Sequence, residues 1–368
     1  MDRYCIYGPA AWDAPGEWYF DAAESALYLI PPPGIDLATA TTESKVLSEA
    51  LVLDGAREVR VTGLSFRGYT LRLHNSKDCE LRKLQLDYPF TIANPFAANL
   101  PYESKAWSAR KWFGESSVDA LTEISGDRSY VRDVRVRYSE GPALTVVGAD
   151  CVIENCEFRG IDWHGLDYGF GIDLLAATRP ALRYMTLAYA GGSEGLRLPN
   201  HSSSLVEYCH LHHCGLRQSD GAIIQTSTPE CRGTEIRFNW IHDHQAFHWG
   251  GNGIRGDDQS RGLLVHHNVV WNCSEKGIVM KGDNHRVHHN ICFDNASIDI
   301  LLPRTRLPGK DKELEQQNRH SLAHDNQGKV QGNWRWEPPA LPYCELRNNL
   351  PAAKEFPKNS GWKAGYAD

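Results

Sequence analysis

The chain has 368 residues, of which 41% are hydrophobic and 23% charged, and its formal net charge is −7. This length accommodates one elongated domain or two compact ones. The negative charge argues against nucleic acid and against an anionic membrane as the main partner, and no window offers the roughly 18 apolar residues that a membrane-spanning helix needs.

The N-terminal residues differ in character from the remainder of the chain. The start, MDRYCIYGPAAWDAPGEWYF, lacks the basic-then-apolar pattern of a signal peptide. We therefore expect a cytosolic chain, or the mature or trimmed form of a longer one. Within residues 1–45, two alternating aromatic and apolar runs flank a polar turn in GEWYFDAAESALYLIPPPG, which predicts a β-hairpin that ends at Pro31–Pro33.

Residues 46–350 are predicted to form one domain built from short repeats. The first two repeats are LVLDGAREVRVTGLSFRGYT and LRLHNSKDCELRKLQLDYPF, and both alternate between apolar and polar residues with period two. Long insertions are expected at 91–117, 160–170 and 303–340, where aromatic or polar residues break the alternation. Residues 351–368 are expected to form a C-terminal tail.

The clearest repeats lie between Gly195 and Leu302. They divide into GLRLPNHSSSLVEYCHLHHCG, GAIIQTSTPECRGTEIRFNWIHDH, GIRGDDQSRGLLVHHNVVWNC and GIVMKGDNHRVHHNICFDN. Each begins with Gly and a short apolar run, continues through a polar turn and a second strand, and ends in a His- and Asn-rich corner. One repeat is too short to bury its own apolar face, so it must stack on the next. The pattern therefore predicts a coiled β-solenoid.

Three sequence segments resemble those of a known group of proteins. In TEIRFNWIHDH, GIRGDDQSRGLLVHHNVVWN and DAPGEWYFDAAESALYLIPPPG the chain resembles the right-handed parallel β-helix carbohydrate-active enzymes of the pectate-lyase-like superfamily. The resemblance implies an all-β, right-handed parallel β-helix with an N-terminal hairpin and long inserted loops. It also implies a poly- or oligosaccharide substrate and a secreted or periplasmic location. The superfamily includes hydrolases, lyases, epimerases and non-enzymatic tailspikes, which leaves the reaction open.

Aligning the repeats places charged residues in columns, because stacked strands lie about 4.8 Å apart. The position before each leading Gly carries Glu194, Asp220, Asn252 and Lys276. Two positions after the Gly, the alignment places Asp173, Arg197, Ile223, Arg255 and Val279, and two further on Leu175, Pro199, Gln225, Asp257 and Lys281. Apolar residues alternate with the last two columns, so the charged side chains of those two columns should face outward. Such a ribbon suits an extended sugar chain.

Glycoside hydrolysis is the reaction that we expect. It needs two carboxylates, about 5 Å apart for retention or about 6.5–9.5 Å for inversion. Glu194 with Asp220 would suit the first spacing, and Asp220 with Asp257 or Asp258 the second. An acidic residue before Gly also commonly satisfies backbone groups in a turn, which is the structural alternative for Glu194 and Asp220. No cofactor is needed for this reaction.

Two other functions stay open. A polysaccharide lyase would act on a uronate polymer by β-elimination, with Lys276 or Arg255 in the proton transfer and, as the resemblance implies, Ca²⁺ held by acidic side chains. A β-helix that binds carbohydrate without chemistry is the third. The expected substrate-binding residues are His242, Arg255, Arg197, His244, Lys276 and Trp249. Metal-ligand spacing such as HExxH is absent, and we predict no metal site.

The remaining His and Asn residues are predicted to be mainly structural. The repeat corners align His212 with His242, Trp271 and Phe293, which favours a packed stack. His242 and His244 are the exceptions that we expect to hydrogen-bond a sugar. Asn239, Asn268 and Asn290 share one column and predict a ladder of stacked side-chain amides.

Overall fold

The computed structural model describes residues 13–21, 23–41, 43, 47, 49–89, 122–163, 170–246, 248–303, 318, 320–331 and 344–347. The predicted insertion at 91–117, most of that at 303–340, residues 164–169 and the C-terminal tail lie outside these residues. The chain divides into two compact units, Met1–Val46 and Leu47–Asp368. In the described part, no helix is long and apolar enough to cross a membrane.

The first unit contains the predicted N-terminal hairpin. Strands β1 (Trp18–Asp21) and β2 (Ala26–Leu29) pair antiparallel, with Trp18 opposite Leu29 and Asp21 opposite Ala26. The alternation of apolar and polar residues on either side of a polar turn is therefore sufficient to place this hairpin.

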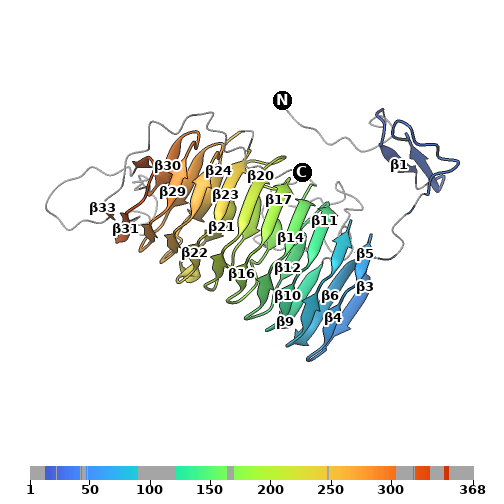
Figure 1. Ribbon diagram of the computed structural model, residues 1–368, viewed down its shortest axis with the longest axis horizontal. Helices are drawn as coiled ribbons and strands as arrows, with labels where there is room; N and C mark the ends of the chain where they lie inside the picture. Colours follow the sequence, from blue (N-terminus) through green and yellow to red (C-terminus); the bar gives the residue numbers. More distant parts are fainter. Residues whose placement is uncertain are drawn as a thin grey trace. The chain divides into compact units, whose positions relative to one another are not determined.

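The second unit is a β-helix made of three parallel sheets (Figure 1). Sheet 1 consists of β3 (Glu49–Asp54), β6 (Thr70–Lys77), β9 (Glu123–Asp127), β12 (Leu144–Val146), β15 (Phe170–Asp173), β18 (Glu194–Arg197), β21 (Gly221–Ser227), β24 (Gly251–Asp257), β27 (Lys276–Met280), β30 (Ile298–Leu301) and β32 (Val330–Gln331). Sheet 2 consists of β4 (Arg60–Thr62), β7 (Glu80–Arg82), β10 (Tyr130–Arg132), β13 (Val152–Glu154), β16 (Ala181–Arg183), β19 (Leu205–Glu207), β22 (Glu235–Arg237), β25 (Leu264–His266), β28 (Arg286–His288), β31 (Ser321–His324) and β33 (Cys344–Arg347).

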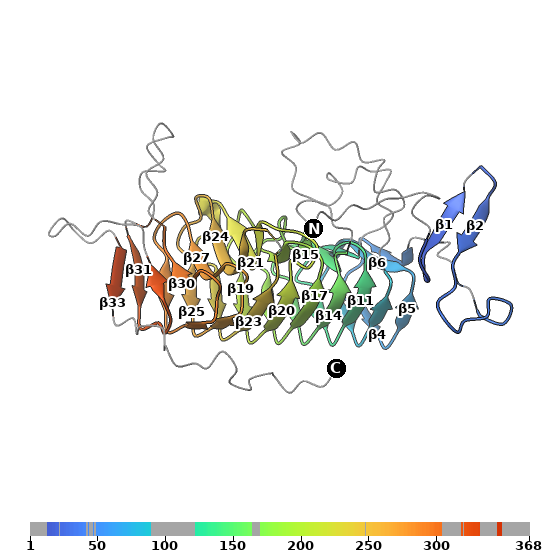
Figure 2. The same ribbon diagram turned by 90° about the horizontal axis from the view of Figure 1, so that it is seen from above.

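Sheet 3 completes each turn of the β-helix. It consists of β5 (Ser65–Arg67), β8 (Gln85–Asp87), β11 (Arg135–Ser139), β14 (Glu157–Ile161), β17 (Thr186–Ala190), β20 (His210–Cys214), β23 (Trp240–His244), β26 (Val269–Trp271) and β29 (Ile291–Phe293). A short 3₁₀ helix, η2 (Pro229–Cys231), lies between β21 and β22. From β3 to β30, every third strand along the chain joins the same sheet, so each turn adds one strand to each sheet (Figure 2). The predicted solenoid is confirmed.

The core is a set of apolar columns that run along the β-helix. In sheet 1, one such column is fully buried and stays in register from β15 to β30: Ile172, Leu196, Ile224, Ile254, Ile278 and Ile300. Burying each of these side chains stabilises the fold by about 1.5–3 kcal/mol. The eight cysteines with described side chains are also buried, and none forms a disulfide.

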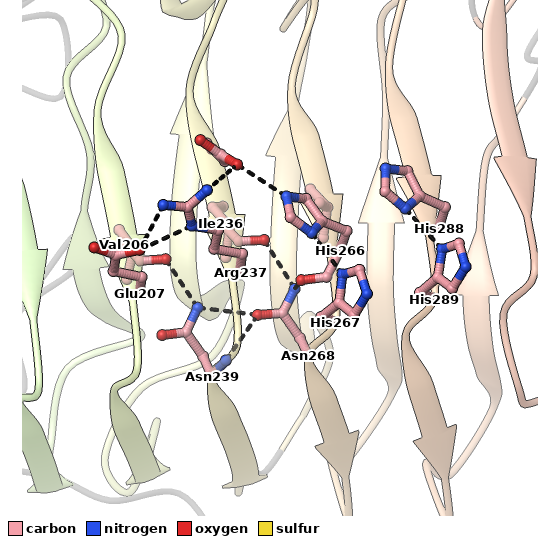
Figure 3. Close-up of polar contacts among 12 residues, drawn as sticks. Val206, Glu207, Ile236, Arg237, Asn239, His266, His267, Asn268, His288 and His289 are labelled. Atoms are coloured by element: carbon pink, nitrogen blue, oxygen red, sulfur yellow. Dashed lines mark hydrogen bonds and ion pairs between the residues drawn. The ribbon is translucent and has the colours of Figure 1, made fainter.

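The corner between sheets 2 and 3 contains the predicted asparagine ladder (Figure 3). Asn239 Nδ2 donates to Asn268 Oδ1 at 2.9 Å, and Asn268 Nδ2 donates to Asn290 Oδ1 at 3.0 Å. The ladder extends one step beyond the prediction, because Asn290 Nδ2 donates to Asn326 Oδ1 at 2.9 Å. Each of these acceptor oxygens also receives the backbone N–H of the preceding asparagine. The ladder therefore satisfies buried backbone groups where the chain turns.

The predicted aromatic stack lies along sheet 3. His212 and His242 have ring centroids 4.9 Å apart and an interplanar angle of 2°. Trp271 stacks on His242 with centroids 4.0 Å apart, and Phe293 follows Trp271 at 5.8 Å. The packing role predicted for this column is confirmed.

Candidate active site on sheet 1

Polar side chains collect along strands β18 to β27 of sheet 1, on the face of the sheet away from the apolar core. A methyl group on Gly195 would lie 3.0 Å from Cys214 Sγ, and the next residue, Leu196, is fully buried. Two successive positions therefore face the core, and the first has room only for glycine. Because of this irregularity, the flanking residues Glu194 and Arg197 both face outward. Their side chains form an ion pair, with Arg197 Nη1 donating to Glu194 Oε1 at 3.0 Å.

The alignment of the leading glycines was wrong by two residues in β21. Gly221 pairs with Gly251, not with Gly253, and Gln225 pairs with both Arg197 and Arg255. Gln225 therefore replaces Ile223 in the arginine column. The next turn contains two candidate glycines, Gly251 and Gly253, and the rule that a repeat starts at Gly cannot choose between them.

In the observed register Glu194 and Asp220, which were predicted to share one column, are separate. The column of Glu194 continues at Ala222 and Asn252, whereas Asp220 precedes β21 by one residue. Glu194 and Asp220 are thus not stacked neighbours. Asn252 and Lys276 do share a column, as predicted.

Arg255 joins the carboxylates of the site. Its Nη1 donates to Asp220 Oδ1 at 2.8 Å, and its Nη2 lies 2.5 Å from Asp257 Oδ2. Lys281 Nζ binds the other oxygen of Asp257 at 2.5 Å. We call these residues, together with Glu194, Arg197, Gln225, Asp258 and Lys276, the charged ribbon. The structure therefore brings the four predicted catalytic carboxylates and three predicted binding cations onto one sheet.

Two adjacent carboxyl groups of the ribbon have opposite electrostatic environments. Burial acts to raise the pKa of Asp257, but the positive charges of Arg255 and Lys281 outweigh it and lower that pKa. Burial raises the pKa of Asp258, and the negative charge of Asp257 raises it further. Opposed shifts of this kind are how a site keeps one carboxylate ionised and the other able to donate a proton.

Glu194 is the third unusual carboxyl group. Burial raises its pKa to about 7, although the charges of Arg197 and Arg255 act to lower it. Its side chain is only 1% exposed and that of Arg197 is 4% exposed. These two residues form the buried floor of the ribbon, while Asp258 is exposed at its edge.

Lys276 is the cation of the ribbon whose surroundings most favour a role as a base. Its side chain forms an ion pair with Glu275. Burial lowers its pKa, and the neighbouring positive charges of Arg255 and Lys281 lower it further. A lysine in such surroundings loses its proton more readily than one in water and can act as a base.

The ribbon also contains groups suited to bind a polar ligand. Gln225 Oε1 and Asn252 Oδ1 are buried and have no hydrogen-bond partner among the described residues. Trp249 is 56% exposed, and its carbonyl oxygen accepts the backbone N–H of Asp220 at 2.8 Å. An exposed indole can stack on a sugar ring, and buried acceptors can receive its hydroxyl hydrogens.

The two histidines predicted to bind sugar are on β23 of sheet 3. His242 is part of the aromatic stack, and its Nδ1 lies 2.6 Å from Asp243 Oδ2. His244 is fully buried, its Nε2 donates to the Ser193 carbonyl at 2.8 Å, and burial lowers its pKa to about 4. The structure does not bring His242 or His244 into the hydrogen-bonded charged ribbon.

The carboxylates of the ribbon do not fit the Ca²⁺ that the resemblance attaches to a lyase. Both oxygens of Asp257 already contact cationic groups, and Asp220 Oδ1 accepts from Arg255. A calcium ion needs six to eight oxygen ligands and would have to displace these cations. We therefore derive no step that involves Ca²⁺.

The comparison with protein-family models agrees with the fold. A family model described as the right-handed β-helix region matches residues 121–298. Among solved structures, the periplasmic alginate epimerase AlgG is 12% identical with a TM-score of 0.48, covering 82% of this chain and 76% of that one. An alginate lyase from a Paenibacillus species is 14% identical (TM-score 0.44; 82% and 95% covered), and pectate lyase Pel9A is 11% identical (TM-score 0.40; 84% and 70% covered). No curated protein matches the chain.

Proposed function

We propose that the chain is a carbohydrate-active enzyme and that the charged ribbon is its active site. The supporting observations are the exposed Trp249 and the two buried acceptors, Gln225 Oε1 and Asn252 Oδ1, that have no partner among the described residues. An unpartnered buried acceptor costs about 1–3 kcal/mol. A ligand that donates hydroxyl hydrogens to both would recover that free energy, and sugars are rich in such donors.

The substrate that we propose is an acidic polysaccharide containing uronate units. This step rests on the convergence of Lys276 with Arg255 and Lys281. The positive charges of Arg255 and Lys281 lie close enough to lower the pKa of Lys276. A uronate carboxylate placed beside Arg255 and Lys281 would be attracted by their positive charges. It would also acidify its own C5–H bond, because the cations stabilise the negative charge that forms when the proton leaves.

The reaction that we propose is β-elimination. Lys276, as the neutral amine, takes the C5 proton, and the electron pair forms the C4–C5 double bond as the C4–O bond breaks. Asp258 carries a raised pKa and is exposed, so it can give a proton to the departing oxygen. If the proton returned to the opposite face of C5 instead, the same groups would invert that carbon without cleaving the chain.

Glycoside hydrolysis is the second candidate, and the opposed pKa shifts of Asp257 and Asp258 favour it. Asp258 would protonate the leaving oxygen, and Asp257 would act as base or nucleophile. The ion pairs of Asp257 with Arg255 and Lys281 weaken this candidate, because both of its oxygens are engaged.

A panel of neutral and uronate-containing polysaccharides distinguishes the two reactions. Reducing ends and the ultraviolet absorbance of an unsaturated uronate are followed in the same samples. We expect both signals to rise together on a uronate polymer. Reducing ends without absorbance would instead establish hydrolysis, and proton exchange at C5 without either signal would establish epimerisation.

Lys276→Gln is the variant that tests the proposed base. It should lower kcat on the uronate polymer by about 10²–10⁴-fold, the usual contribution of a positioned base, while leaving the melting temperature nearly unchanged. Lys77→Gln, in β6 of the same sheet but outside the ribbon, is the matched control and should retain full activity. Full activity of Lys276→Gln combined with loss in Asp257→Asn would assign the chemistry to the carboxylates.

A further inference from the structure

Two neighbouring columns run along sheet 2, one formed by the last residue of each strand and the other by the residue that follows it. Both columns change their residue types in the same turns. In three successive turns the last strand residue is charged and the following residue is aromatic: Arg183–Tyr184, Glu207–Tyr208 and Arg237–Phe238. In the next three turns the pairs are His266–His267, His288–His289 and His324–Asp325. The second residue of every pair has a positive φ.

Stacking alone does not explain these histidines. Tyr208 and Phe238 already stack well, with ring centroids 5.1 Å apart and an interplanar angle of 5°. His267 continues that column beyond Phe238 at 5.0 Å. A tyrosine or phenylalanine would fill the same position, so the change to imidazole adds nitrogen atoms that the packing does not require.

In each of two turns, adjacent histidines direct ring nitrogens toward one another (Figure 3). The second such pair is His288 Nδ1 and His289 Nδ1, which lie 2.9 Å apart. His266 Nδ1 lies 2.7 Å from His267 Nδ1, and the ring of His288 stacks on that of His266 with centroids 4.9 Å apart. One ring nitrogen from each of His266, His267 and His288 lies within 4.8 Å of the other two. His266 is buried, whereas His267 is exposed and open to solvent.

A carboxylate behind the group fixes the hydrogen on His266. Its Nε2 lies 2.9 Å from Glu235 Oε1, and an ionised carboxylate can only accept, so Nε2 carries the hydrogen. The lone pair of His266 Nδ1 therefore faces His267. Histidines that bind metal ions are commonly oriented by a carboxylate in this way.

The surroundings of His267 and His288 favour their neutral forms. Burial lowers the pKa of His288 to about 4, and the neighbouring imidazoles lower it further. The pKa of His267 is lowered for the same two reasons. Unprotonated imidazole is the form that binds a metal ion.

We propose that His266, His267 and His288 bind a divalent transition-metal ion such as Zn²⁺ through one nitrogen each. The hydrogen that His267 now shares with His266 would move to the other nitrogen of its own ring, which leaves three neutral ligands. Three imidazoles suit Zn²⁺, Cu²⁺ or Ni²⁺ and leave a coordination position for water or a further ligand.

Two similar groups are less suited to metal. In the group of His213, His242 and Asp243, the carboxylate already binds His242 Nδ1 at 2.6 Å and also accepts from Asn272. In the group of His289, His324 and Asp325, the carboxylate lies 2.8 Å from His324 Nδ1. In both groups the carboxylate is already paired with a histidine nitrogen, and a metal ion would have to displace that contact.

The test titrates the full chain with Zn²⁺ after chelation and dialysis. His267→Tyr with His288→Arg restores the residue types that earlier turns carry in these columns, so this double variant should fold normally. Calorimetry should show a site in the unmodified chain that the double variant loses. Zn²⁺ should also raise the melting temperature of the unmodified chain only, because a ligand of the native state stabilises it.

Further variants separate a specific site from general affinity of histidines for Zn²⁺. Glu235→Gln should weaken binding by about 10–100-fold, the usual effect of losing the carboxylate behind a ligating histidine. His201→Gln changes an exposed histidine outside the three groups and should bind as the unmodified chain does. Equal affinity in the unmodified chain and in a folded His267→Tyr, His288→Arg variant would overturn the proposal.

Discussion

At the scale of single residues, Arg255 is the centre of the charged ribbon. One guanidinium bonds Asp220, which precedes β21, and Asp257, at the end of β24. Its side chain is 11% exposed and that of Asp257 is 10% exposed. Both charges are therefore largely removed from water, and each depends on the other for compensation.

Replacing Arg255 with Met should destabilise the fold by about 3–5 kcal/mol, because a buried carboxylate would lose its main partner. Urea unfolding measures this change. Arg128→Met is the matched control, because Arg128 pairs with Asp78 in the solvent-exposed part of the surface and its loss should change stability little. Equal effects of the two substitutions would show that the Arg255 pair is hydrated in solution.

At the scale of structural elements, the corner between sheets 2 and 3 depends on the side chain of one column. In earlier turns the column contains apolar or thiol groups, such as Met185 and Cys209, and from Asn239 onward it contains amides. The first amide also serves the preceding turn, because Asn239 Oδ1 accepts the backbone N–H of Cys209 at 2.9 Å. Each asparagine thus satisfies a backbone group one turn away.

Asn268→Ala should destabilise the protein by about 3 kcal/mol, because it leaves the Asn239 N–H and the Ile236 carbonyl without their partner in a buried corner. Thermal or urea unfolding provides the measurement. Cys209→Ala, in the same column, removes only a thiol and should have a clearly smaller effect. If Asn268→Ala proved neutral, water would have to replace the amide in the corner.

At the scale of the whole molecule, buried histidines make stability depend on pH. His244 and His285 are fully buried, and burial lowers the pKa of each to about 4 from 6.5. The unfolded chain therefore binds more protons than the folded one between these values, so the free energy of unfolding falls as the pH falls from 6.5 to 4. Each histidine contributes on the order of 3 kcal/mol to this loss.

Urea unfolding at pH 7.5 and at pH 5 should show the lower stability at pH 5. Glu194 opposes this trend, because its pKa of about 7 lets the folded chain keep a proton that the unfolded chain loses above pH 4.5. His210 and His212, with pKa values lowered by burial to about 4 and about 3, add to the effect of the buried pair. Replacing His285 with Gln should reduce the pH dependence, and stability that is equal at the two pH values would contradict the argument.

The sequence by itself determined the architecture. A period-two pattern in units too short to fold alone can bury its apolar side chains only by stacking, so the β-solenoid, the hairpin and the Asn239, Asn268 and Asn290 ladder were all predictable. These features depend on local patterns that repeat along the chain. The candidate residues Glu194, Asp257 and Arg255 were found for the same reason, since each falls at a regular repeat position.

Only the tertiary structure decided which of these residues meet. The displacement of Asp220 depends on which of two glycines pairs with Gly221, and hydrogen bonds between turns determine that choice. The positions of His242 and His244 on sheet 3, and not on sheet 1 with the charged ribbon, likewise follow from which sheet each strand joins. The grouping of His266, His267 and His288 arises because residues about one turn apart in the sequence become neighbours in space, which no spacing motif within a single turn could reveal.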